Sequence, residues 1–474
     1  MNRSDLTDDQ NAAIDRLYNF DETFLVAPTG AGKTAIVLTA ISELIEAGEL
    51  SRVLVIAPLK VCLTTWANEA QKWAHLSGTT ISLAVEGPLE RIASMGTLAN
   101  VVVVNEENVE WLLRCGFHTD FDGLVIDETS RWSQIGGSRY KALRKVVKGF
   151  KWRVGMTAEP VSEDWVRLYG QLRLIDLGKS LGKSKDRYLR KHFYPTDWEQ
   201  RNWEVLPGQA EKIAAKLAPI VHVMPDYKAD TLPEKRVTYV PITLPDEAFR
   251  RYTRMRIDSI LNVEGETIKA GSRAVLSGKL EQIAAGFSYL DDEDGTGSGS
   301  RNWIVHHFEK LDWVVARARE LLIAGDSVII VYWYHAEREA LREMFPDALE
   351  ISGTPKQISS AMKKWKEQTG QTMLLQPSSA SHGVDGLQDT CHWQLWLNPI
   401  WSKDKTNQCG DRLWRRGQRF PVEIEIAVAI GTVDEIKRNS VEIKGGHHEL
   451  FLEHLDASSD GLTLAERSSL GEAM

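Results

Sequence analysis

An apolar run followed by a loop of small residues, FLVAPTGAGKTA at 24–35, constrains the fold of this chain more than any other feature. Residues 24–27 predict a buried strand, and the Gly-Lys-Thr at 32–34 opens a stretch that predicts a helix through residue 47. A tight turn between a strand and a helix N-terminus presents backbone N–H groups to an anion. The stretch therefore predicts a phosphate-binding loop within an α/β domain.

The chemistry of such a loop assigns roles to its residues. The backbone of residues 28–32 would wrap the phosphates of a nucleotide, and these residues are Pro28, Thr29, Gly30, Ala31 and Gly32. Lys33 would reach the β- and γ-phosphates, and the Thr34 hydroxyl would ligate Mg²⁺. The strict motif begins with Gly, whereas this loop begins with Ala27.

A second motif, LVIDETS at 124–130, places two acids after an apolar strand. The carboxyl end of a strand is where ligands meet an open parallel sheet. We expect Asp127 to hold Mg²⁺ and Glu128 to orient and deprotonate the attacking water. Together with the loop, these acids predict the binding and hydrolysis of a nucleotide, as in kinases, GTPases and transporters.

The rest of the chain alternates apolar strands with amphipathic helical stretches, which predicts two parallel sheets buried on both faces. At 474 residues the chain suits two or three domains. We expect a first α/β lobe over 1–230, a polar helical protrusion or linker over 231–302, a second lobe over 303–455 and a weakly ordered tail over 456–474.

Composition excludes several classes of protein. No apolar run approaches the roughly 20 residues of a membrane span, and the acidic N-terminus does not resemble a secretory signal. The four cysteines are far apart, as in a reduced cytosolic protein, and the paired histidines at 306–307 and 447–448 lack zinc-ligand spacing. We therefore expect a cytoplasmic protein that does not bind membranes.

Charge leaves the question of nucleic acid open. The net charge is −9, but two segments, 139–153 and 179–191, are dense in Lys and Arg. Each predicts either a solvated helix face or a phosphate-binding surface. The 16 tryptophans raise a similar choice, because some of them could stack on unpaired bases. Most of them lie in apolar or amphipathic stretches, where core packing is the favoured interpretation.

A third motif, QCGDRLWRRGQ at 408–418, carries two arginines three residues apart, which share one face if the segment is helical. Arg412 and Arg415 could stabilise the charge of a transferring phosphoryl group from a second domain. The alternative is a surface helix with ordinary salt bridges.

Taken together, these motifs resemble those of the superfamily 2 helicases, and within them the Swi/Snf-type branch of double-stranded DNA translocases. Further segments resemble the Q motif (6–17), motif Ia (53–73), motif III (156–160), motif IV (328–337) and motif V (378–388). Residues 408–418 match the Q-x-x-x-R-x-x-R-x-G-Q form of motif VI. The resemblance covers roughly residues 6 to 445, and the compact length is most similar to helicases that bacteriophages encode.

The resemblance implies an α/β fold of two tandem RecA-like lobes, with Mg-ATP between them and duplex or forked DNA as the partner. It further implies that Gln10 reads adenine and that Gly383 and Asp385 of motif V lie near the nucleotide. Lys185, Arg187, Arg190 and Lys191 are the expected DNA contacts of the second basic segment. A monomer acting in phage DNA replication or remodelling, with replication proteins as possible partners, would follow from this resemblance.

Three departures from the family pattern put the strength of coupling between ATP hydrolysis and movement in doubt. Ser130 replaces the histidine of motif II, Glu159 replaces a neutral residue of motif III, and Trp414 stands where motif VI commonly has histidine. Two alternatives also stay open: an RNA helicase or annealing ATPase, and a non-catalytic nucleotide-binding clamp.

Overall fold

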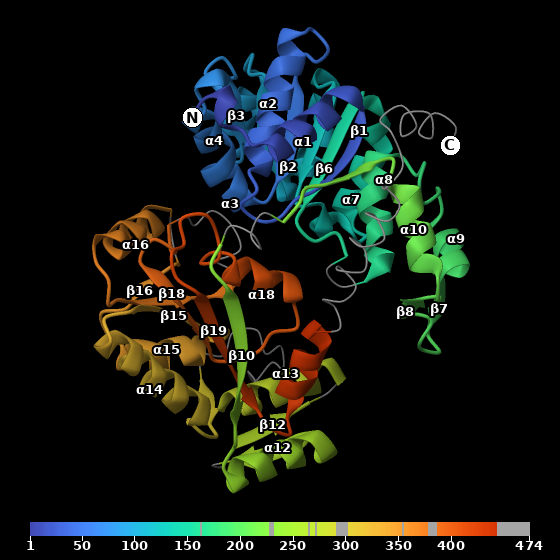
Figure 1. Ribbon diagram of the computed structural model, residues 1–474. Helices are drawn as coiled ribbons and strands as arrows, with labels where there is room; N and C mark the ends of the chain where they lie inside the picture. The colour runs from blue at the N-terminus through green and yellow to red at the C-terminus, as the bar shows by residue number, and fades with distance from the viewer. Residues whose placement is uncertain are drawn as a thin grey trace. The chain divides into compact units, whose positions relative to one another are not determined.

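The computed structural model describes residues 1–161, 164–226, 232–263, 266–270, 273–290, 302–352, 355–377 and 386–442 (Figure 1). Contacts divide the described residues into two compact units, one up to residue 226 and the other from residue 232. Each unit is built around its own parallel sheet, so the prediction of two tandem RecA-like α/β lobes is confirmed.

The first unit has a seven-stranded parallel sheet in the order β3-β4-β2-β5-β6-β1-β9. Its strands are β1 (Glu22–Val26), β2 (Val53–Ala57), β3 (Ile81–Ala84), β4 (Val101–Asn105), β5 (Gly123–Asp127), β6 (Trp152–Thr157) and β9 (Val221–Val223). Its helices include α1 (Asp8–Asn19), α2 (Lys33–Glu46), α3 (Leu59–Val61), α4 (Ala67–Lys72), α5 (Pro88–Met95), α6 (Val109–Arg114), α7 (Ser138–Val146), α8 (Leu168–Ile175), α9 (Lys185–His192) and α10 (Gln209–Leu217).

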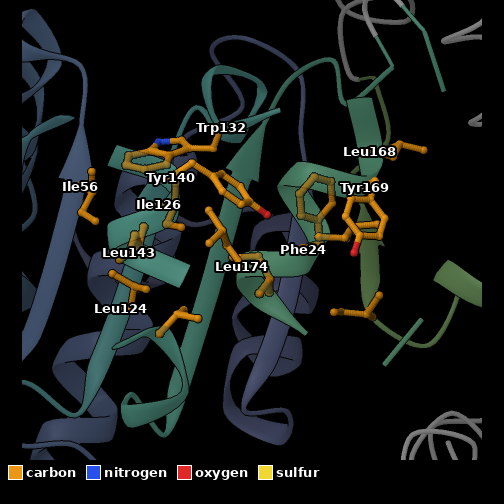
Figure 2. Packing of buried hydrophobic residues seen from close by; sticks show 14 of the residues in the cluster. Phe24, Ile56, Leu124, Ile126, Trp132, Tyr140, Leu143, Leu168, Tyr169 and Leu174 are labelled. Atoms are coloured by element: carbon orange, nitrogen blue, oxygen red, sulfur yellow. The ribbon is translucent and has the colours of Figure 1, made fainter. Parts of the chain in front are cut away.

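Both faces of this sheet are buried, as the continuous apolar strands predict. Successive residues of one strand point to opposite faces, so Phe24 and Leu25 of β1 belong to different core clusters. Figure 2 shows part of the first cluster, where Phe24, Ile126 and Leu124 face side chains of α7 and α8 such as Tyr140 and Tyr169. The packed sheet gives the loops at its carboxyl edge a fixed support.

The second unit has a six-stranded parallel sheet in the order β10-β19-β18-β15-β17-β16. Its strands are β10 (Lys235–Ile242), β15 (Ser327–Val331), β16 (Leu349–Glu350), β17 (Thr372–Leu375), β18 (Cys391–Trp396) and β19 (Val422–Ala429). Its helices include α12 (Asp246–Asp258), α13 (Arg273–Ala285), α14 (Glu309–Ile323), α15 (His335–Met344), α16 (Pro355–Glu367) and α18 (Lys403–Gly410). Two short antiparallel hairpins also belong to this unit. One pairs β11 (Ile260–Val263) with β12 (Glu266–Lys269), and the other pairs β13 (Phe287–Tyr289) with β14 (Trp303–Val305).

The segment 231–302, expected to be a helical protrusion or linker, differs from that expectation at its start. Strand β10 pairs with β19 along its whole length and so belongs to the second sheet. The sequence obscured this strand because β10 is an edge strand, and an edge strand keeps polar residues on its exposed side. The rest of the segment contains helices α12 and α13, the hairpin of β11 and β12, and strand β13.

Candidate active site

The loop between β1 and α2 has the backbone that its glycines permit. Gly30 and Gly32 have φ angles of +86° and +85°, in the left-handed region that side chains rarely adopt. A Cβ atom on Gly32 would also lie 2.6 Å from Nε2 of Gln10. Position 32 therefore favours glycine because of its backbone conformation, and a side chain there would also displace the Gln10 amide from the loop.

Gln10 lies against this loop. At the start of α1, the backbone N–H of Gln10 donates to the Thr7 hydroxyl at 3.3 Å, and the backbone N–H of Thr7 donates to Oε1 of Gln10 at 3.0 Å. Its Nε2 donates to the carbonyl oxygen of Ala31 at 2.9 Å, and the side chain is buried. Gln10 thus ties α1 to the loop, and its contact with adenine stays a prediction.

Lys33 is the first residue of α2 and turns back over the loop. Its Nζ donates to the carbonyl oxygens of Ala27 at 2.8 Å and Pro28 at 3.3 Å. The ammonium therefore lies beside the backbone that is expected to surround the phosphates. Thr34 follows in the first turn of the helix and is half-buried.

Asp127 lies at the carboxyl end of β5, where a tryptophan from another element reaches it. Trp66 ends a π-helical turn, Cys62–Trp66, and its Nε1 donates to Oδ2 of Asp127 at 3.1 Å. Burial, and then the adjacent Glu128, raise the pKa of Asp127 to about 6, while Lys33 and the Trp66 hydrogen bond act in the opposite direction. The charged carboxylate is thus costly to hold without a nearby cation.

Glu128 has an uncommon backbone conformation, with φ of 62° and ψ of 65°. Two hydroxyls donate to its Oε1, that of Ser130 at 2.6 Å and that of Thr157 at 3.0 Å. Thr157 ends β6, the strand between β5 and β1, and its carbonyl oxygen accepts from the N–H of Ala27 at 3.1 Å. Thr157 therefore contacts both the acid pair and the first residue of the loop.

Ser130 occupies the position where the family has histidine, and it contacts Glu128 directly. The connection between the acids and the segment 156–160 runs through the Thr157 hydroxyl rather than through residue 130. The Thr157 hydroxyl also accepts from the N–H of Glu159 at 3.3 Å. The departures at Ser130 and Glu159 therefore leave a hydrogen-bonded path between the two motifs.

The oxygen donors of this site fit Mg²⁺. The Thr34 hydroxyl and the Asp127 carboxylate are hard ligands, and Mg²⁺ is commonly held by one or two such groups together with substrate phosphates. Among the described residues, no group of three or more His, Cys, Asp or Glu side chains gathers into a metal-only cluster. The donor set therefore suits a metal that arrives with a nucleotide.

In the second unit, Arg412 and Arg415 lie in turns outside any helix, so the shared helical face that their spacing allowed is not formed. Helix α18 ends at Gly410, and residues 411–417 form consecutive turns. Gly417 ends these turns in the left-handed region, with φ of +97°. Both arginines are half-buried. The buried Leu413 between them anchors the turn in the second core.

The last glutamine of this motif fixes the turn. Gln418 donates through Nε2 to the carbonyl oxygens of Cys391 at 3.0 Å and Leu413 at 3.2 Å, and its Oε1 accepts from the N–H groups of residues 419 and 420. Gln388 of the motif V segment donates to the carbonyl oxygen of Arg416 at 3.4 Å. Gly383 and Asp385 lie outside the described residues.

The two basic segments differ in how their charges are used. In 139–153, Arg139 lies 3.7 Å from Glu106, Lys151 lies 3.3 Å from Asp122, and Arg153 is buried and paired with Glu22. This segment therefore serves in part to hold the first unit together. On α9, Arg187, Arg190 and Lys191 are exposed and Lys185 is half-exposed, and none of the four makes an ion pair with a described residue.

Sequence reasoning missed two residues of this site. Trp66 was interpreted as core packing, and it is buried, but it also donates to Asp127. Thr157 was noted only as part of the segment 156–160. The sequence did contain a signal for Thr157. It is a hydroxyl residue at the carboxyl end of an apolar strand, and such ends lie at the same edge of a parallel sheet as the acids.

Comparisons with known proteins found several that are similar to this chain. A family model described as DEAD/DEAH box helicase matches residues 7–162, which span Gln10, the loop, the acid pair and Thr157. A phage protein called putative protein p41, from Acyrthosiphon pisum secondary endosymbiont phage 1, is 27% identical over 94% of this chain and 97% of its own length.

Two longer proteins are also similar. An uncharacterized ATP-dependent helicase of Mycoplasma genitalium is 22% identical over 86% of this chain, and the RAD54-like DNA repair and recombination protein of Drosophila ananassae is 20% identical over 88%. The chain spans 38% and 58% of the lengths of these two proteins. A solved Sulfolobus solfataricus SWI2/SNF2 ATPase core in complex with dsDNA is 19% identical, with a TM-score of 0.43 over 98% of this chain and 96% of its own.

Proposed function

We propose that this chain, which belongs to the Swi/Snf-type superfamily 2 helicases and is an ATP-hydrolysing enzyme, couples hydrolysis of Mg-ATP to movement along DNA. The observation that carries the proposal is the hydrogen-bonded path through Thr157, which joins the phosphate loop to Glu128. A motor needs such a path because the state of the nucleotide must alter another part of the protein.

The residues of the first unit would divide the chemistry between them. The loop N–H groups and Lys33 bind the phosphates, since Lys33 already lies over the loop backbone. Glu128, oriented by Ser130 and Thr157, positions the attacking water and accepts its proton at a carboxylate oxygen. Mg²⁺ held by Thr34 and Asp127 would neutralise phosphate charge.

The arginines of the second unit complete the proposed reaction. A guanidinium binds phosphate oxygens bidentately, and this is the contact that we propose for Arg412 and Arg415. Their turn is held by Gln388 and Gln418, so both arginines are carried on a supported backbone. Arg412→Lys or Arg415→Lys is therefore expected to reduce turnover while ATP binding to the first unit persists.

DNA is the proposed partner, contacted through its phosphates, because a protein that moves along DNA cannot depend on specific bases. Exposed Arg187, Arg190 and Lys191, with Lys185 beside them, form the surface of α9 that we assign to this contact. Changing all four to glutamine should weaken DNA binding and lower the slope of log affinity against log salt by about 3 to 4. An unchanged slope would reject this surface.

The assignment of the hydrolytic site is tested by phosphate release. Lys33→Ala should lose ATP binding and hydrolysis, whereas Glu128→Gln should bind ATP and fail to hydrolyse it. Wild-type turnover in either variant would exclude the proposed site. A role for a monomeric cytoplasmic enzyme in phage DNA replication or remodelling is the biological setting that we propose, supported by the phage relative.

In the described part of the chain, no helix is both long and apolar enough to cross a membrane.

A further inference from the structure

A short β-hairpin in the first unit carries a fully exposed tryptophan. Strands β7 (Phe193–Pro195) and β8 (Trp203–Val205) pair in antiparallel fashion, and the loop 196–202 joins them. Trp198 in this loop is 99% exposed. Figure 1 shows the hairpin extending beyond α9 and α10. An indole wholly in water is unusual enough to suggest that it binds something.

The loop that carries this indole is held in one conformation by Asp197. The Asp197 carboxylate accepts from the N–H groups of Arg201 at 2.8 Å and Asn202 at 3.0 Å. The loop closes further where Thr196 donates to the carbonyl oxygen of Asn202 at 3.0 Å. Because the loop is already ordered, a ligand of Trp198 would cost little conformational entropy to bind.

The base of the hairpin is fixed to the core. Phe193 is buried and its ring lies 5.0 Å from that of Tyr188 on α9. His192 Nδ1 lies 2.8 Å from Oε1 of Gln209 on α10. The hairpin, α9 and α10 thus form a single supported structure.

The charges next to the hairpin indicate the kind of ligand. Helices α9 and α10 are packed together where the His192 ring of α9 meets Gln209 of α10. Lys191 of α9 lies close enough to Lys216 of α10 to lower the pKa of Lys216, after the larger effect of burial. Arg187 and Arg190 add two further exposed cations on α9, and Lys212 adds one on α10. The acids of the hairpin are already engaged. Asp197 holds the loop, Glu199 pairs with Arg201 at 2.9 Å, and Glu204 accepts from the Tyr194 hydroxyl. Asp186 and Glu211 are the acids on the two helices themselves.

We propose that Trp198 stacks on an unpaired base of a DNA strand whose phosphates lie along the basic surface of α9 and α10. Every base presents an aromatic face, so stacking tolerates any sequence and suits a protein that moves. Bases within a duplex are already stacked on both sides, and only a single strand or the junction of a fork can offer one. The inference rests on the proposed DNA-motor function and names the DNA structure that this hairpin would engage.

The test compares Trp198→Ala with Trp198→Phe. Binding of fluorescein-labelled oligothymidine and of a blunt duplex is measured at one salt concentration, and ATP hydrolysis is measured without DNA. Loss of one stacked base should weaken oligothymidine binding by about tenfold in Trp198→Ala. Trp198→Phe should restore most of that affinity, while duplex affinity and hydrolysis without DNA stay at the wild-type level.

Leu98→Ala is the matched control, because Leu98 is another exposed apolar side chain of the first unit, 96% exposed. It should leave every measurement unchanged. The proposal is overturned if Trp198→Ala binds oligothymidine as the wild type does, or if it loses duplex affinity equally. It is also overturned if light scattering shows that Trp198→Ala abolishes self-association with no change in DNA binding. Failure of the DNA-motor function would instead appear in the wild-type protein, as an absence of DNA-stimulated hydrolysis.

Discussion

Thr157→Val is the substitution that most sharply tests how Glu128 is positioned. The change keeps the shape of a fully buried side chain and removes the hydroxyl that donates to Glu128 Oε1 at 3.0 Å. A hydrogen bond to a charged group contributes about 1.5 to 3 kcal/mol. We expect this bond to act in the transition state, where Glu128 must be held against the attacking water, and the loss of that stabilisation there lowers kcat by about 10- to 100-fold. The N–H of Glu159 also loses its acceptor, so some loss of stability is expected.

The assay is steady-state phosphate release, with ATP affinity measured separately by titration. Ser130→Ala removes the other hydroxyl on the same oxygen, and the two substitutions should be non-additive because they share Glu128 as a partner. Thr23→Val on β1 is the matched control, since the buried Thr23 hydroxyl makes no hydrogen bond within the described residues. Near-wild-type kcat in Thr157→Val, or in the double variant, would refute the reasoning.

Three further predictions concern the loop, the metal site and pH. Gly32→Ala should abolish binding of a fluorescent ATP analogue, because the new Cβ meets Gln10; retained affinity would contradict the strained geometry. Trp66→Phe should lower the free energy of unfolding in urea by about 2 to 3 kcal/mol, because Asp127 loses its donor; an unchanged midpoint would argue against that bond. Burial lowers the pKa of His306 and His307 to about 4, so the unfolded chain binds more protons below pH 6.5 and stability falls toward pH 4, by about 1.4 kcal/mol per pH unit for each histidine. Replacing both with glutamine should flatten that slope in acid unfolding, and an unaltered slope would contradict it.

The fold could be predicted to the extent that its strands are continuous apolar runs. Strands such as β2 and β4 consist almost entirely of Val, Ile, Leu and Ala, and a parallel sheet covered on both faces requires that composition. Strand β10 escaped this reasoning because it is an edge strand in which Lys235, Arg236 and Thr238 interrupt the apolar residues. The spacing of Arg412 and Arg415 allowed a helix without requiring one, and the structure has consecutive turns there, with Gly417 in the left-handed region.

The residues of the candidate site followed from local motifs, whereas their mutual contacts did not. Lys33, Asp127 and Glu128 are each recognisable within their own segment. The bonds from Trp66 to Asp127, from Gln10 to Ala31 and from Thr157 to Glu128 join segments far apart in the sequence. The order of strands brings Thr157 to Glu128, because β6 lies beside β5, and Trp66 to Asp127, because β2 lies on the other side of β5. The Gln10–Ala31 bond depends instead on the position of α1 against the phosphate loop.

The most direct test of the central claim is ATP hydrolysis at one salt concentration without DNA, with oligothymidine and with a blunt duplex. Wild-type protein and Glu128→Gln are compared in all three conditions. The proposed function predicts that DNA raises wild-type turnover and that Glu128→Gln is inactive throughout. Turnover that is the same with and without either DNA, or that persists in Glu128→Gln, would contradict an ATP-driven DNA motor built on this site.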